Sequence, residues 1–268
     1  MNILRIIGFL CWASALLFSC KTKTDKVKTT YFFDTLVNQF PKYQVYEDYQ
    51  LPLPIEIFEQ IKNKYKHSYE FLADKYNEIV LQSWKQAIIL GIYTADIAYN
   101  AEYYMTTDVI KYSELCSKIS DELCIESSYS MNFINRLENN INNKDSIISI
   151  TNLAYYQTCK ILDEQQKNNI LPFVVFGGWL ETLNIISKCT KNDTIILNIA
   201  INKIDKLIEF LNDSKIETTA YHFQKEIDKI IVSLEKLNKK YKQYKEQATL
   251  HKINFFEDIE KLKNDILG

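Results

Sequence analysis

Glycine and proline are scarce in this sequence, with five glycines and four prolines in 268 residues. A β-rich fold uses both residue types in its many tight turns, so this composition disfavours such a fold. Strand-like alternation of apolar and polar residues is also lacking. We therefore expect an all-α domain over residues 55–268, a multi-helix bundle or helical array of about eight to ten helices.

Arginine is almost absent, and positive charge is not in surplus. The only arginines are Arg5 and Arg136, and the formal net charge is −2. Without residues 1–19, which contain Arg5, the chain has 31 basic and 34 acidic residues. Nucleic-acid binding depends on a basic surface, so we expect no nucleic-acid partner.

The usual motifs of metal, phosphate and nucleophile chemistry are missing. The three histidines are scattered and form no metal-ligand spacing. A glycine-rich phosphate loop and a Gly-x-Ser-x-Gly elbow are absent too, so we expect no metal and no cofactor. Four cysteines lie in apolar helical patterns that favour buried free thiols, although an oxidising compartment permits a disulfide, whose pairing stays open. They are Cys116, Cys124, Cys159 and Cys189.

The N-terminus indicates lipidation. A short positive segment, 1–5, precedes an apolar run at 6–18 that is too short to span a bilayer comfortably. Residues 17–20, Leu-Phe-Ser-Cys, resemble the lipobox of bacterial lipoproteins, although Phe18 stands where a small residue is usual. We therefore predict a signal peptide over 1–19 and a lipid on Cys20 that holds the protein on a membrane. The alternative is a plain signal peptide with an incidental cysteine.

Two further segments separate Cys20 from the helices. Residues 20–30 form a polar tether, in which Lys21 is not the aspartate that favours inner-membrane retention. We expect a location in the cell envelope, on the outer membrane and facing the periplasm. Residues 31–54 are rich in aromatic residues and hold three of the four prolines, which predicts an extended arm lying on the domain.

Apolar periodicity predicts the helices. The eighth has the most regular pattern, a heptad seam in which apolar residues recur at alternating spacings of four and three over 223–248. If this face is exposed, it predicts self-association. Asp108 and Asp193 are candidate N-caps. The expected helices are 55–81, 82–104, 108–123, 127–142, 144–165, 172–188, 193–212 and 223–248, followed by an amphipathic stretch at 255–266.

Two adjacent glycines interrupt the apolar segment 173–182, FVVFGGWLET. Each glycine weakens a helix by about 1 kcal/mol relative to alanine, so a packing reason is expected. Small residues recur on one face of the helix at 82–104, where Gly91 is central. We predict that Gly91, Gly177 and Gly178 form a close-packing notch between two helices. A ligand approaching the exposed backbone is the alternative.

Polar residues in apolar helices mark a candidate network. Asp96 and Glu181 lie among apolar neighbours, where an ionised carboxylate needs a partner. Arg136 is the best bidentate partner for either of them. A buried network that fixes helix register is the favoured interpretation. The alternative is a carboxylate pair that performs acid–base chemistry or binds a cation.

Four ordered blocks resemble a family of uncharacterised Bacteroidetes lipoproteins. The family has a Pro-x-Pro opening, a Gly-Val-Tyr-Gly-Ala-Asp block, an Asn/Asp-Ser block and a Gly-Gly-Trp-Ile-Glu block. Here the corresponding segments are 51–58, 90–99, 136–146 and 177–181, with Thr94 in place of the second glycine. The resemblance implies a helical, membrane-anchored protein and no established activity. It also implies that Asp96, Arg136, Asp145 and Glu181 belong together.

The leading functional hypothesis is a non-enzymatic binding or scaffolding module anchored through Cys20. Its candidate contact surfaces are the aromatic arm and the heptad face. One alternative is a small-ligand receptor or enzyme centred on Asp96, Arg136 and Glu181. A periplasmic chaperone-like holdase is a further alternative, and it would need a broad apolar groove.

Overall fold

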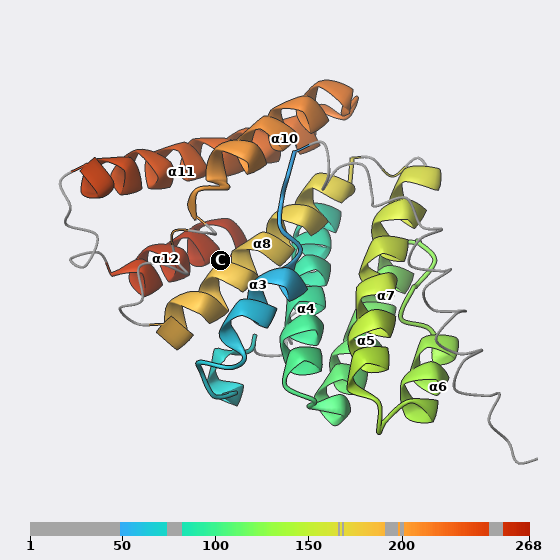
Figure 1. Ribbon diagram of the computed structural model, residues 1–268. Helices are drawn as coiled ribbons and strands as arrows, with labels where there is room; N and C mark the ends of the chain where they lie inside the picture. The colour runs from blue at the N-terminus through green and yellow to red at the C-terminus, as the bar shows by residue number, and fades with distance from the viewer. Residues whose placement is uncertain are drawn as a thin grey trace, which may run out of the picture. The chain divides into compact units, whose positions relative to one another are not determined.

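Every regular element that the structure describes is helical (Figure 1). The structure is a computed structural model, and it describes residues 49–73, 82–165, 167, 169–190, 198, 201–246 and 254–268. The all-α prediction is confirmed. The predicted signal peptide, tether and most of the aromatic arm lie outside the described residues. The elements are α3 (Pro54–Ile61), the 3₁₀ turn η1 (Tyr69–Phe71), α4 (Ser83–Glu102), α5 (Thr106–Glu122), α6 (Met131–Asn139), α7 (Lys144–Glu164), α8 (Leu171–Thr190), α10 (Ile204–Glu217), α11 (Tyr221–Glu246) and α12 (Phe255–Leu267).

Helix α4 forms the centre of the described core. Every residue from Ala87 to Glu102 is buried. Its most extensive contact is with α8, and α3, α5 and α7 cover its other sides (Figure 1). A helix that is apolar on most of its surface is stable only with neighbours all around it, and this arrangement supplies them.

The first predicted helix, 55–81, is wrong in length. Helix α3 ends at Ile61, and a turn and the non-helical residues 66–68 follow, with Ser68 extended. Tertiary contacts hold this departure from helix: His67 stacks on the ring of Tyr99, with 4.9 Å between the centroids, and the Ser68 N–H donates to the Tyr99 hydroxyl at 3.1 Å. These contacts override the local helical pattern.

Two further boundaries differ from the prediction. Asp108 does not cap α5, because this helix already begins at Thr106 after Met105. A turn at residues 202–203 precedes α10, which then runs to Glu217. The predicted continuous helix 193–212 is therefore wrong at that turn, and Asp193 lies outside the described residues.

The heptad face of α11 is buried within the chain. Leu234 and Ile227 are fully buried, and Phe223 packs on Phe173 of α8 with 5.8 Å between ring centroids. Helices α10 and α12 also contact α11. Self-association through 223–248 would need this face to be exposed. In the described residues the chain itself covers the face, so that requirement is not met.

The last residues of the predicted arm lie on the domain. The Tyr49 ring meets Phe210 of α10 edge-on at 5.4 Å, and its hydroxyl donates to Asp213 Oδ2 at 2.6 Å. Leu51 and Leu53 are buried. The described part of the arm is thus held by an aromatic contact, as its composition suggested.

Two helices end in left-handed backbone without a glycine. Tyr104 follows α4 with φ 62°, and Cys124 follows α5 with φ 54°. In each case the next N–H, of Met105 or Ile125, bonds a carbonyl five residues back. Glycine is the usual residue at such a position. These two helix ends therefore form without glycine, and no described glycine has a positive φ.

Candidate functional site

The backbones of α4 and α8 touch where Gly91 and Gly177 lie. A Cβ atom on Gly91 would come within 2.1 Å of the Val174 carbonyl oxygen. One on Gly177 would lie 2.1 Å from the Ile88 carbonyl oxygen. Both obstacles are helix backbone and cannot move aside, so any side chain at either position would separate the helices.

Gly178 differs from its neighbour. A Cβ there would meet the Tyr155 hydroxyl at 3.4 Å and the Gly91 carbonyl oxygen at 3.5 Å, which are ordinary contacts. The three glycines predicted to act together therefore divide into two kinds. Gly91 and Gly177 allow the backbone contact, whereas Gly178 has room for a methyl group.

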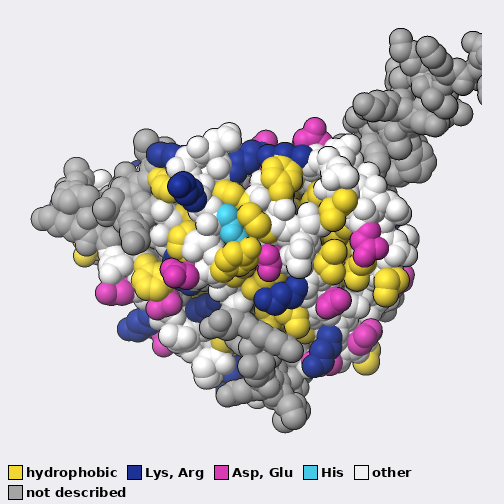
Figure 2. Space-filling model, turned by 90° about the horizontal axis from the view of Figure 1, so that it is seen from below, with side chains coloured by type: hydrophobic (Ala, Val, Ile, Leu, Met, Phe, Trp, Pro, Cys, Tyr) yellow, Lys and Arg dark blue, Asp and Glu magenta, His cyan; other side chains and the backbone are white. Residues whose placement is uncertain are grey.

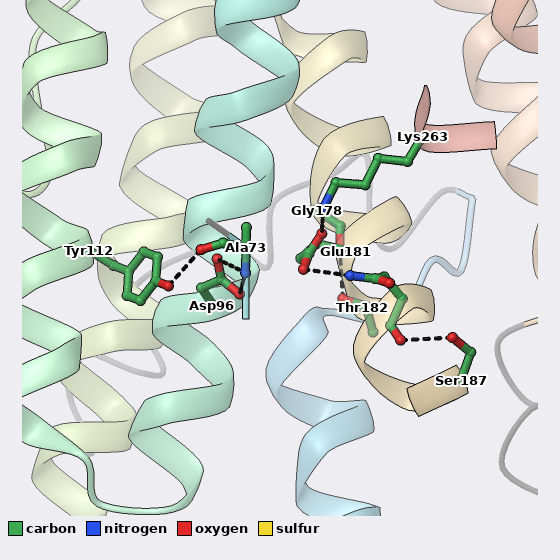
Figure 3. A network of polar contacts seen from close by, with 9 residues as sticks. Ala73, Asp96, Tyr112, Gly178, Glu181, Thr182, Ser187 and Lys263 are labelled. Carbon is green, nitrogen blue, oxygen red and sulfur yellow. Dashed lines mark hydrogen bonds and ion pairs between the residues drawn. The ribbon is translucent and has the colours of Figure 1, made fainter. Parts of the chain in front are cut away.

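Asp96 lies beside this contact, on α4, and is fully buried. Its side-chain partner in the described residues is the Ala73 N–H, which approaches Oδ2 at 3.4 Å and Oδ1 at 3.5 Å. The Ala73 carbonyl accepts from the Tyr112 hydroxyl at 2.9 Å, which holds this segment in place (Figure 3). Such long bonds compensate little of the cost of burying a charge.

Glu181 is also fully buried but is better partnered. Lys263 of α12 donates to Oε2 at 2.7 Å, and Asn184 donates to Oε1 at 2.9 Å. Figure 3 shows the Lys263 side chain reaching this carboxylate from the C-terminal helix. The result is a charge-assisted pair inside the core, which joins α8 to α12.

Burial, and next the negative charge of Glu181, raise the pKa of Asp96 well above its usual range. Lys263 and the Ala73 N–H oppose this shift, but they are weaker influences. The arrangement therefore favours the protonated form of Asp96, whereas the Glu181 carboxyl group is paired with Lys263. Since both carboxylates are fully buried, neither has a path for exchanging protons with a substrate in this conformation.

Arg136 and Asp145 do not join the network, contrary to our prediction. Arg136 is half-buried on α6, where burial lowers the pKa of its guanidinium, and it makes no ion pair with Asp96 or Glu181. Asp145 is exposed in the first turn of α7. The cation that the network needed is Lys263, which the sequence alone did not single out among many lysines.

A second candidate site is a surface cluster of aromatic side chains that we call the aromatic patch. It consists of His67, Tyr69 and Tyr103, and the Tyr65 backbone carbonyl and Tyr104 adjoin it in the chain. The His67 imidazole has Tyr69 and Tyr103 against its ring edges, at centroid distances of 4.8 and 5.5 Å. On the face that Figure 2 shows, which is seen from below relative to Figure 1, hydrophobic side chains surround a histidine. Tyr69 is 62% exposed and Tyr104 is 38% exposed.

Hydrogen bonds fix the aromatic patch. His67 Nε2 lies 2.9 Å from Asn100 Oδ1, and the Tyr103 hydroxyl donates to the Tyr65 carbonyl at 2.9 Å. The Tyr69 hydroxyl contacts the Met105 sulfur at 3.7 Å. The patch was not predicted from the sequence, because residues 65–69 fell within the helix expected over 55–81. The spacing of Tyr99 and Tyr103 by about one helical turn, which puts both rings on one face, was the sequence feature that could have indicated it.

Other chemistry finds little support in the described part of the chain. No group of three or more His, Cys, Asp and Glu side chains there could hold a metal ion. The four described cysteines are free thiols, and Cys124, expected to be buried, is exposed. Burial raises the pKa of Cys159 and of Cys189 to about 12, which disfavours the reactive thiolate at these two positions. None of the described helices has both the length and the apolar character that a membrane span requires.

Comparisons with protein-family models, with curated proteins and with solved structures give no match. The resemblance to Bacteroidetes lipoproteins therefore stays a prediction.

Proposed function

We propose that the protein is a lipid-anchored, non-enzymatic binding or scaffolding module of the cell envelope. In this proposal a lipid on Cys20 holds it on the outer membrane, facing the periplasm, and the aromatic patch binds a protein partner. The Leu-Phe-Ser-Cys segment at 17–20 supports the anchor. The observation that carries the binding role is the exposed Tyr69 ring, which packs on a half-buried set of rings around His67.

Order in the aromatic patch favours binding. Tyr69 is exposed, yet its ring already packs on His67 and its hydroxyl contacts Met105. A side chain held in place before binding loses less conformational entropy when a partner arrives. Tyrosine provides a large apolar ring with a polar end and is enriched at protein interfaces.

The other candidate roles have less support. A receptor or enzyme built on Asp96, Arg136 and Glu181 requires these side chains to meet, and Arg136 does not reach the two carboxylates. Self-association through α11 would use a face that the chain already covers. No observation favours the chaperone-like holdase.

Site-specific photocrosslinking in intact cells tests the proposal. A photoreactive phenylalanine analogue replaces Tyr69 in one strain and Val232 in another. Val232 is a matched control because it is an exposed apolar residue, 46% exposed, on α11. We expect a discrete crosslinked product from position 69 and none from position 232. Equal products from both positions, or none from either, would contradict a binding role for the aromatic patch.

The anchor is tested separately. Labelling cells with a radioactive fatty acid should mark the wild-type chain and leave the Cys20→Ala variant unlabelled. If the crosslink at position 69 needs membrane proximity, it should weaken in this variant. Labelling that survives Cys20→Ala would contradict lipidation at Cys20.

A further inference from the structure

The side-chain amide of Asn100 determines how the His67 ring carries its proton. Asn100 is fully buried, and its Nδ2 donates to the Asp96 backbone carbonyl at 2.8 Å. A carbonyl oxygen can only accept, so this bond fixes which end of the amide is nitrogen. The amide oxygen, Oδ1, therefore faces His67 Nε2 at 2.9 Å and accepts a hydrogen bond from it. In the neutral imidazole the proton is then on Nε2, and Nδ1 keeps a lone pair.

Nδ1 of His67 is an acceptor that solvent can reach. In the described part of the chain the bond from Nε2 to Asn100 is the one hydrogen bond of this ring, so Nδ1 has no partner there. Nor does Nδ1 belong to the buried side-chain atoms without a partner, which in the same residues lie on four other side chains. The aromatic patch thus presents one fixed and unused acceptor, on the ring that Tyr69 and Tyr103 contact.

The charges around the aromatic patch disfavour an ionic ligand. Lys64 and Lys66 are exposed on the loop that carries the histidine, against one exposed acid, Glu70. On the same loop Lys62 is paired with the buried Glu102 at 2.7 Å. A cation would therefore meet positive charge, and a carboxylate or phosphate would face the lone pair of the imidazole. An uncharged N–H or O–H donor suits this acceptor.

We infer that His67 Nδ1 accepts a hydrogen bond from an aromatic N–H or O–H of the protein partner, which is the indole of a tryptophan or the phenol of a tyrosine. The donor matches the unused lone pair, and the ring that carries it packs on the tyrosine rings of the patch. Tryptophan and tyrosine are the side chains that most often combine an apolar ring with one donor at protein interfaces. This inference rests on the proposed function, because it names the chemical group that the aromatic patch takes from its partner.

Nitrogen NMR of the imidazole rings provides the test. The reference is the chain from residue 20 on, with Cys20→Ser so that it carries no lipid. It contains three histidines, His67, His222 and His251, and His67→Gln assigns the signals of the first. Two-bond proton–nitrogen spectra show which ring nitrogen carries the proton, and for His67 we expect Nε2. Titration with indole, and in parallel with phenol, should move the His67 Nδ1 signal saturably, because its lone pair gains a donor. The exposed His222 is the matched control and should not respond.

Further controls separate the donor from the ring. 1-Methylindole keeps the ring but lacks the donor, so it should bind about three- to tenfold more weakly than indole. His67→Phe removes the acceptor and should bind the two compounds equally. Tyr69→Ala, at an exposed position, removes part of the ring surface and should weaken the binding of both compounds by similar factors. The reference spectrum needs no substitution in the patch, so the test remains decisive if His67→Phe fails to fold.

Three outcomes would overturn the inference. One is a His67 ring that at neutral pH carries its proton on Nδ1, or protons on both nitrogens. Another is equal binding of indole and 1-methylindole to the reference chain. The third is an Nδ1 signal that benzoate or butylammonium moves and indole does not, which would indicate a charged ligand. A discrete crosslink from position 69 beside any of these results would keep the binding role and remove the aromatic donor alone. Failure here and failure of the proposed function are therefore distinguishable.

Discussion

The α4–α8 contact and the α11 seam solve the same packing problem in opposite ways. Helices α4 and α8 are in backbone-to-backbone contact, because Gly91 and Gly177 have no side chains to separate them. Helix α11 meets its neighbours through large side chains such as Leu234. Contact without side chains leaves no freedom to adjust, whereas interlocking side chains can shift rotamers. The two regions should therefore differ in their tolerance of substitution.

The largest expected effect is a difference in stability between alanine substitutions at two adjacent glycines, Gly177 and Gly178. Gly177→Ala places a methyl group 2.1 Å from the Ile88 carbonyl oxygen and should cost at least about 4 kcal/mol or prevent folding. Gly178→Ala has room and gains helix propensity, so it should change stability by no more than about 1 kcal/mol. Urea unfolding followed by circular dichroism compares them. Similar losses for both variants would refute the backbone contact.

The next effect concerns the charge pair that joins α8, one partner in the backbone contact, to α12, which packs against α11. Lys263→Met leaves the buried Glu181 carboxylate without its cation and should lower the free energy of unfolding by about 3 kcal/mol. Adding Glu181→Gln should restore most of the loss, because it removes the unpaired charge. A double variant as unstable as Lys263→Met alone would show that the pair acts through packing.

The α11 seam should respond as an ordinary core. Leu234→Ala removes a fully buried side chain and should cost about 3 kcal/mol, whereas Val232→Ala on the exposed face should change stability by less than about 0.5 kcal/mol. Analytical ultracentrifugation of the wild type should find a monomer. If dilution alone destabilised the wild type, the seam would be an interface between chains.

The smallest effect is a pH dependence at Asp96. Burial raises the pKa of this carboxyl above its value in the unfolded chain, so the folded state holds its proton more tightly. Protonated Asp96 therefore stabilises the folded state fully at pH values below the pKa of this carboxyl group in the unfolded chain. This contribution is lost as the pH rises through the pKa of the same group in the folded chain. Asp96→Asn should therefore be more stable than the wild type by about 1 kcal/mol at neutral pH, and less so in acid.

Unfolding at several pH values measures this effect, with the exposed Asp145→Asn as the matched control. The difference between Asp96→Asn and the wild type should grow by no more than about 1.4 kcal/mol per pH unit, the limit for one proton. A constant difference across the pH range would show that Asp96 stays in one protonation state.

The helices could be predicted from the sequence wherever one periodic pattern ran unbroken. Helices α4, α7, α8 and α11 begin and end within a few residues of their predicted bounds. The prediction was wrong at α3, where His67 leaves the helical path to stack on Tyr99. Local propensity contains no information about a partner that lies in another helix.

The polar network shows the same limit more sharply. Asp96 and Glu181 stood out because carboxylates are rare in apolar helices, and the structure buries both. Arg136, the only arginine outside residues 1–19, also stood out, but the cation that pairs with Glu181 is Lys263. Lysine is too common in this chain for composition to identify one of them. Pairing between distant segments depends on topology, which periodicity does not determine.

The Lys263–Glu181 pair also bears on proteolysis. Its two members are 82 residues apart, so every peptide bond between α8 and α12 lies inside the loop that the pair closes. A cut in that interval would leave α12 attached to the core by non-covalent contacts alone, with this pair among them. If α12 then dissociated, the Glu181 carboxylate would lose its cation inside the core, and breaking a buried pair in this way costs about 3–5 kcal/mol.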